Sequence, residues 1–279
     1  MTELIEIEPF GAGYHAAAGH PHNVRMAAAL KAVAEHSPIC FLKGEYLPCS
    51  SPTVPGSGAY YTFGSGLAID AGRFGENAKE HPELSDILLE ILEELRPYNT
   101  GEQVGICRDR YQAELSSTGA CWGGGWAGHS NPDYDRLLSL GTEGIRELIA
   151  KYRRINPEEA DFYDGCDIVL DAVDILGERF LALAEKSESE TSDPGEKRIY
   201  AELTSAFRQI PRRPARNMCE AICLFWMIFT FDGIDSPGRL DQFFLPAWEA
   251  TERENAMLWL DRLWQAFHRT RTWNLCISG

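Results

Sequence analysis

Three features are missing from this sequence, and each absence excludes a class of protein. None of the eight cysteines forms a CxxC motif, which argues against a zinc ribbon or a thioredoxin-like redox site. The longest apolar run, residues 221–231, is shorter than the roughly 20 residues that span a bilayer. The N-terminus carries acidic residues, whereas a secretory signal peptide begins with basic ones. We therefore expect a cytoplasmic protein whose thiols are reduced.

Positive charge is also scarce. Lys and Arg number 26 against 42 Asp and Glu, which gives a formal net charge of −16. A chain this acidic repels phosphate backbones, so we expect no nucleic-acid partner, and without a spanning segment we expect no membrane partner. Hydrophobic residues make up 44% of the 279 residues and charged residues 24%, as in a folded globular protein.

Helical periodicity dominates the patterns that are present. Apolar residues recur at three- and four-residue spacing, and Pro follows Asn or Asp where helices begin. These patterns predict helices over residues 23–36, 83–96, 134–149, 157–183, 195–209, 216–231 and 252–268. Strand-like composition is confined to residues 39–47, 242–245 and 272–278. So few strands make a poor sheet, and we expect a mainly α chain with no clear domain linker.

Neither the histidines nor the neighbouring thiols predict a metal site. His15, His20 and His22 lie in an Ala-, Gly- and Pro-rich stretch, which favours solvated loop histidines. Cys219 and Cys223 share a face of a predicted helix without a further ligand, which favours core packing. The glycine-rich residues 48–66 and 116–131 predict loops, and they lack the Gly-Lys-Ser/Thr ending of a phosphate-binding loop.

Two segments could carry function. His129 lies on a glycine-rich loop just before a predicted helix, whose N-terminus would favour a bound anion. The alternative is a hydrogen-bonded histidine within a helix cap. Arg239 and Asp241 are two residues apart and would share one face of a strand. There the alternative to a binding role is a buried ion pair.

Several segments, taken in order, carry a family resemblance. They comprise residues 128–138, 141–145, 161–163, 178–184, 210–216 with Glu220–Ala221, 236–242 with Pro246, and 273–279. The ordered set resembles the N-terminal part of a glycyl radical enzyme of the pyruvate formate-lyase-like superfamily. The resemblance is strongest over residues 119–279 and loose over residues 1–118.

The resemblance implies a fold and a mechanism. Residues 1–279 would supply the N-terminal helical part, and the start of the first half-barrel, of a ten-stranded β/α barrel. In such enzymes a radical stored on a backbone glycine passes to a cysteine, whose thiyl radical takes a hydrogen atom from the substrate. A radical S-adenosylmethionine activating enzyme with an iron–sulfur cluster installs the glycyl radical, and homodimers are common.

The sequence departs from that family in two respects. It contains neither the reactive cysteine loop nor the Arg-Val-x-Gly-Tyr segment around the radical glycine. The Gly165–Cys166 pair does not match the loop, because its setting is helical. We therefore expect no catalytic residue, bound cofactor or metal in this chain, and no activity without the C-terminal half-barrel. The chain would be an N-terminal fragment, a truncated frame or half of a split enzyme.

The resemblance also nominates pocket residues. His129 and Ser236 would bind substrate hydroxyls, as in the diol-dehydratase branch. Residues with a structural role near the site would be Asp133, Arg239, Asp241 and Trp273.

Three functional hypotheses follow. The first is the N-terminal segment of a radical lyase or dehydratase acting on a small organic substrate such as a 2-oxo acid, diol or amino alcohol. The second is a non-catalytic helical binding or regulatory protein derived from that scaffold, and the third is an unrelated helical enzyme using a thiol. A large exposed apolar patch would favour the first hypothesis.

Overall fold

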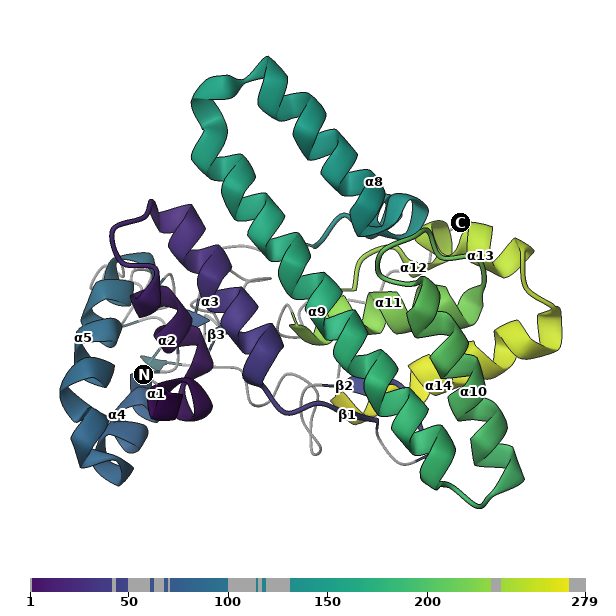
Figure 1. Ribbon diagram of the computed structural model, residues 1–279. Coiled ribbons are helices and arrows are strands. Elements are labelled where there is room, and N and C mark those ends of the chain that lie inside the picture. The colour runs from purple at the N-terminus through teal and green to yellow at the C-terminus, as the bar shows by residue number, and fades with distance from the viewer. Residues whose placement is uncertain are drawn as a thin grey trace. The chain divides into compact units, whose positions relative to one another are not determined.

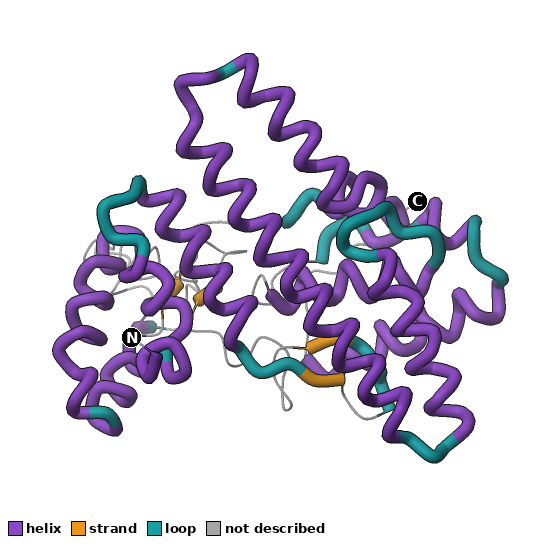
Figure 2. Tube along the Cα trace, viewed as in Figure 1, coloured by secondary structure: helices purple, strands orange, loops and turns teal. Residues whose placement is uncertain are grey.

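The computed structural model resolves the chain into two compact units. Residues 59–131 form one unit, inserted in sequence between the two parts of the other, residues 1–58 and 132–279. The structure describes residues 2–41, 44–49, 61–62, 68–69, 71–99, 114, 117–118, 131–231 and 237–270. Helices dominate these residues, and the four strands among them have two residues each (Figure 2). The expectation of a mainly α chain is confirmed.

The larger unit is built from helices and one short hairpin (Figure 1). Its N-terminal part contains α1 (Thr2–Ile7), α2 (Pro9–Ala16), α3 (His22–His36), β1 (Cys40–Phe41) and β2 (Pro48–Cys49). Its C-terminal part contains α8 (Tyr134–Ile155), η3 (Pro157–Glu159), α9 (Ala160–Glu190), α10 (Pro194–Gln209), α11 (Met218–Phe231), α12 (Leu240–Phe243), α13 (Leu245–Glu249) and α14 (Arg253–Thr270). The strands β1 and β2 pair antiparallel, with Cys40 opposite Cys49.

The helix starts follow local chemistry that the sequence makes visible. Asp133 precedes α8, and its carboxylate accepts a hydrogen bond of 3.0 Å from the backbone N–H of Arg136. Asp193 caps α10 in the same way, with Pro194 as its first helical residue. These caps satisfy backbone donors that have no partner within the helix.

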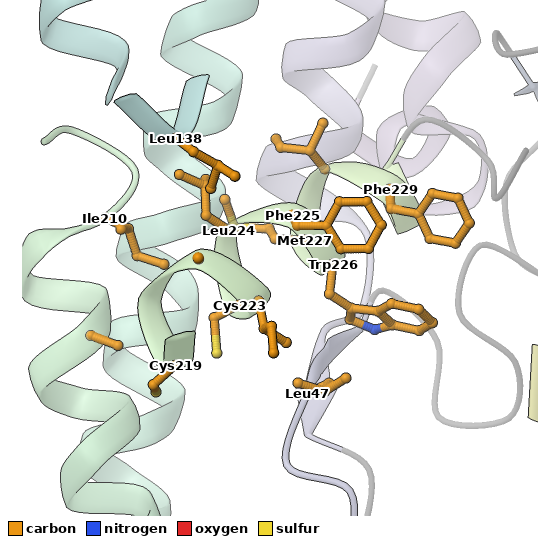
Figure 3. Close-up of a cluster of buried hydrophobic side chains, with 14 of the residues drawn as sticks. Leu47, Leu138, Ile210, Cys219, Cys223, Leu224, Phe225, Trp226, Met227 and Phe229 are labelled. Carbon is orange, nitrogen blue, oxygen red and sulfur yellow. The ribbon is translucent and has the colours of Figure 1, made fainter. Parts of the chain in front are cut away.

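The core is organised around α11, which is buried on every side. Its residues from Met218 to Thr230 are all buried, so its apolar character runs round the whole helix. Figure 3 shows Ile210 and Leu138 beside α11, with the indole of Trp226 extending toward Leu47. The ring of Phe225 lies 4.8 Å from that of Tyr134 and 5.5 Å from that of Phe243, centroid to centroid. Such offset and tilted ring pairs add to the stabilisation from burial.

The helices α8 and α9 form an antiparallel hairpin whose facing sides carry opposite charges (Figure 1). Arg146 on α8 pairs with Asp171 at 2.9 Å and with Asp174 at 3.2 Å on α9. Nearer the tip, Arg153 pairs with Asp167 at 2.7 Å. The carboxylates of Asp167 and Asp171 are partly exposed, so their pairs are worth little individually. Asp174 is buried and also accepts a hydrogen bond from the Thr142 hydroxyl, and together these pairs fix the register of the two helices.

A glycine lets α8 approach the segment between α10 and α11. Gly141 interrupts α8 with φ 64° and ψ 178°, a region that essentially only glycine adopts. At that kink the next two N–H groups, of Thr142 and Glu143, donate to the carbonyls of Pro211 and Arg212 at 2.9 and 3.0 Å. The peptide bond between Ile210 and Pro211 is cis.

The described residues of the smaller unit include a β-ribbon, α-helices and short 3-10 turns. The ribbon pairs β3 (Tyr61–Thr62) with β4 (Ala68–Ile69). The helical elements are α4 (Ala71–Glu80), η1 (Pro82–Leu84), α5 (Ser85–Leu95) and η2 (Arg96–Tyr98). Buried side chains on α5 are Leu88, Ile91 and Leu95, as helical spacing predicts.

Two local predictions are wrong. Residues 242–245 do not form a strand: they lie at the junction of α12 and α13, where the adjacent rings of Phe243 and Phe244 both pack against Phe225. The N-terminal histidines do not share a loop, because His15 lies in α2 and His22 in α3. The tyrosine hydroxyl of Tyr14 lies 3.2 Å from Nδ1 of His22. The strand predicted over residues 272–278 lies outside the described residues.

Among the described residues, no helix combines the length and the apolar character needed to cross a membrane.

Candidate functional site

The residues predicted to bind substrate lie outside the part of the chain that the structure describes. These are His129 and Ser236; Trp273, predicted to have a structural role near the site, also lies outside the described residues. The structure does describe Asp133, which is exposed, caps α8 and pairs with Arg136 at 3.4 Å. Its carboxylate therefore holds the start of the helix that follows the predicted His129 loop.

Arg239 and Asp241 do not behave as the buried ion pair considered from sequence. Arg239 is exposed and precedes α12, and no ion pair joins it to Asp241 although the structure describes both side chains. Asp241 is half-buried, and its Oδ1 atom is fully shielded with no hydrogen-bond partner among the described residues. Shielded carboxylate oxygens in folded proteins almost always have a hydrogen-bond partner, so a polar group is expected beside this one.

Asp241 lines an apolar cavity in the larger unit. The cavity has a volume of about 550 Å³ and lies between the α12–α13 segment and α14. Its walls are mostly apolar and are formed by Met218, Leu240, Asp241, Phe244, Leu245, Trp248, Met257, Leu260, Asp261 and Trp264. Two carboxylates, of Asp241 and Asp261, are the acidic groups in this lining.

The rim of the cavity is unusually apolar for a surface in contact with water. The exposed fractions of Leu245, Met257 and Trp264 are 50%, 53% and 47%. Trp264 lies on the same helix as Leu263 and Phe267, yet those two side chains are buried and that of Trp264 is exposed. Contiguous exposed apolar surface marks an interaction site. The sequence signal for this exposed surface is the wide apolar face of α14. That face is wider than a helix can bury against a single neighbour.

Other residues from the segments that carry the family resemblance stabilise the fold. Glu220 is buried at the first turn of α11 and accepts hydrogen bonds from the backbone N–H and guanidinium of Arg216, at 2.6 and 2.5 Å. Asn217 caps the same turn by accepting from the N–H of Glu220 at 3.0 Å. The hydrogen bonds to Glu220 raise the pKa of Arg216.

The helical cysteines show no reactive setting. Cys219 and Cys223 are buried in α11, and burial raises the pKa of Cys219 well above its ordinary value. Cys166 is half-buried in α9, and burial raises its pKa as well. Neither setting stabilises a thiolate, and the helical setting predicted for Gly165–Cys166 is confirmed.

Sequence comparison finds similarity to one group of enzymes. A family model described as pyruvate formate lyase-like matches residues 6–273. The isethionate sulfite-lyase of Oleidesulfovibrio alaskensis is 28% identical over 129 residues, which cover 41% of this chain and 16% of that protein.

Structure comparison finds the same fold in longer proteins. The hydroxyproline dehydratase of Clostridioides difficile has a TM-score of 0.69 at 16% identity, covering 98% of this chain and 38% of that one. A glycyl radical enzyme from Archaeoglobus fulgidus has a TM-score of 0.65 at 20% identity, covering 95% of this chain and 38% of that one. The chain therefore spans about a sixth of the curated relative and less than two fifths of the solved chains.

Proposed function

We propose that this chain, which belongs to the pyruvate formate lyase-like family, forms the N-terminal part of a glycyl radical lyase or dehydratase. The family match over residues 6–273 is the observation that carries the proposal. The similarity to an isethionate sulfite-lyase and the fold shared with a hydroxyproline dehydratase support a small organic substrate.

The radical chemistry belongs to another part of the enzyme. The chain contains no Arg-Val-x-Gly-Tyr segment, and its Gly165–Cys166 pair lies within a helix. No cysteine or glycine that the structure describes fits the thiyl or glycyl radical position, which supports a chain that is inactive alone. A second polypeptide region supplies both groups, and a radical S-adenosylmethionine enzyme installs the glycyl radical there.

This chain contributes one wall of the substrate site. His129 and Ser236 bind substrate hydroxyls, and Asp133, Arg239, Asp241 and Trp273 hold the surrounding backbone. The cap that Asp133 makes on α8 supports this role, because it fixes the helix that begins five residues after His129. Asp241 supports it too, because its shielded oxygen lies on the helix that follows Ser236.

The apolar cavity is where the second polypeptide region packs. Exposed Leu245, Met257 and Trp264 would be covered by apolar side chains of that region. Covering such residues stabilises an interface by about 25 cal/mol for each Å² of apolar surface removed from water. The matched part makes up 38% of each of these two solved chains, so more chain lies outside the match than within it, which is enough to cover the cavity.

Co-expression tests the proposal. The chain is produced alone and together with a polypeptide, encoded beside it, that carries the cysteine loop and the Arg-Val-x-Gly-Tyr segment. After anaerobic activation, electron paramagnetic resonance should show a glycyl radical in the complex and none in the chain alone. A stable monomer that binds no such polypeptide would refute the proposal and would favour a non-catalytic binding or regulatory protein.

A matched pair of variants tests the cavity. Trp264→Ser should weaken the complex, because Trp264 rims the cavity at 47% exposure. Tyr152→Ser removes an aromatic ring of similar exposure, 48%, from α8 outside the cavity, and it should leave the complex intact. Equal effects of the two variants on the dissociation constant would argue that the cavity is not the interface.

A further inference from the structure

Two cysteines meet across the hairpin formed by β1 and β2. Cys40 and Cys49 are direct cross-strand partners, and their Sγ atoms lie 3.8 Å apart. Cβ atoms of such partners lie about 4.5–5.5 Å apart, and a disulfide needs about 3.5–4.5 Å. A small inward movement of the two strands therefore allows a bond between the sulfur atoms.

The two thiols have different environments. Cys40 is half-buried, whereas Cys49 is fully buried. A hydrogen bond from Cys49 lowers the pKa of Cys40, burial opposes that shift, and the positive charge of Arg269 adds to it. The carboxylate of Glu45 pairs with Arg269 at 2.9 Å and limits the effect of that charge. Cys40 is thus the more accessible thiol and the readier to become a thiolate.

The other described cysteines lack this combination. Cys219 and Cys223 are neighbours on α11, but both are buried and the pKa of Cys219 is raised. Burial also raises the pKa of Cys166, which has no cysteine opposite it among the described residues. The pairing of an accessible thiol with a buried partner is therefore specific to the hairpin within the described part of the chain.

We propose that Cys40 and Cys49 form a reversible disulfide by exchange with a small-molecule disulfide such as oxidised glutathione. The Cys40 thiolate attacks one sulfur of glutathione disulfide, forming a mixed disulfide and releasing one glutathione, which takes the proton that Cys40 lost. Cys49 then loses its proton and attacks the Cys40 sulfur, releasing the second glutathione. Two protein thiols are oxidised, and one glutathione disulfide is reduced to two thiols.

The hairpin's contacts give this bond a structural consequence. The ring of Phe41, beside Cys40, packs against those of Phe180 and Phe207 on α9 and α10 at 5.8 and 6.2 Å. Glu45, within the same hairpin, binds Arg269 at the end of α14. A bond between the strands would hold these two attachments in one rigid unit.

Disulfide mapping of the folded protein tests the proposal. The reduced chain is titrated with oxidised glutathione, quenched with an alkylating agent and digested without reductant. Mass spectrometry should find the Cys40–Cys49 linkage before any other among the eight cysteines, and dithiothreitol should reverse it. A first linkage elsewhere, or a glutathione adduct on Cys40 that never resolves, would overturn the proposal. In urea the preference for this pair should disappear.

Single variants separate the two steps. Cys49→Ala should accumulate glutathione on Cys40, whereas Cys40→Ala should leave the buried Cys49 unmodified. Cys166→Ala, a half-buried control on α9, should leave the titration unchanged. Modification of Cys49 in folded Cys40→Ala would contradict the assigned order of attack. Circular dichroism of each reduced variant checks that the fold is retained. The disulfide mapping of the unaltered chain does not depend on whether the variants fold.

Discussion

Gly141→Ala tests whether the kink in α8 holds the segment between α10 and α11. The backbone at Gly141 has φ 64° and ψ 178°, and holding a residue with a side chain there costs about 1–3 kcal/mol. An added Cβ would also lie 2.7 Å from the carbonyl carbons of Arg212 and Arg213. Overpacking of that kind costs about another 1–3 kcal/mol, because the contact is with backbone that cannot rotate away.

We therefore expect Gly141→Ala to lower the free energy of unfolding by about 2–6 kcal/mol, the sum of these two costs. For a large domain each kcal/mol corresponds to a fall in melting temperature of roughly 2–4 °C. Thermal and urea unfolding, followed by circular dichroism, measure the change. Hydrogen exchange gives a local readout, since the amides of Thr142 and Glu143 donate to the 211–212 carbonyls and should exchange faster in the variant.

The control is Gly75→Ala in α4. A Cβ added at Gly75 meets nothing within 4 Å, and its backbone is helical. That variant should be neutral or gain up to about 1 kcal/mol from the higher helix propensity of alanine. A Gly141→Ala protein as stable as the unaltered chain, with unchanged exchange at residues 142 and 143, would refute the proposed role of the kink.

Three other measurements bear on the core, the helical hairpin and the thiols. Asp174→Asn removes the carboxylate that binds Arg146 at 3.2 Å, and urea titration should show that the free energy of unfolding falls by ~1–3 kcal/mol. A fall seen only at low salt would instead indicate a surface effect. Phe225→Ala empties the centre of the aromatic cluster and should cost about 3–5 kcal/mol by the same assay, with Phe225→Leu milder. In iodoacetamide labelling across pH, Cys40 should react at lower pH than Cys166, because hydrogen bonding lowers the pKa of Cys40 and burial raises that of Cys166; coincident profiles would contradict this.

The helices of the larger unit could be predicted because their signals are local. Asp133 caps α8 and Asp193 caps α10. Each cap can be predicted, because an Asp stands directly before a segment with apolar residues at helical spacing. The apolar run in α11 likewise predicts burial on all sides. A cap or a stripe depends on neighbours within a few residues, so no knowledge of the tertiary structure is needed.

The errors arise where distant residues decide. Phe243 and Phe244 suit a strand by composition, but packing of both rings against Phe225 selects the helical junction. Gly11 and Gly13 disfavour a helix locally, yet α2 packs so tightly on α3 that a Cβ at Gly13 would lie 2.7 Å from the Ala28 carbonyl oxygen.

The candidate site was predictable only in part for the same reason. The sequence nominated Asp241 from its spacing to Arg239, but its shielded oxygen and the cavity around it depend on α14, which follows later in the chain. The pairing of Cys40 with Cys49 was likewise not predictable. The hairpin brings the two thiols together, and their spacing in the sequence matches no motif such as CxxC.

The ion pair between Glu45 and Arg269 has a consequence for the order in which the protein folds. Its partners are 224 positions apart in the sequence, and both side chains are largely shielded. During synthesis the hairpin formed by β1 and β2 leaves the ribosome before α14 is made. Until then Glu45 has no Arg269 with which to pair. The early segment therefore lacks this contact until α14 has left the ribosome, and until then it is exposed to chaperones and to oxidants on that side.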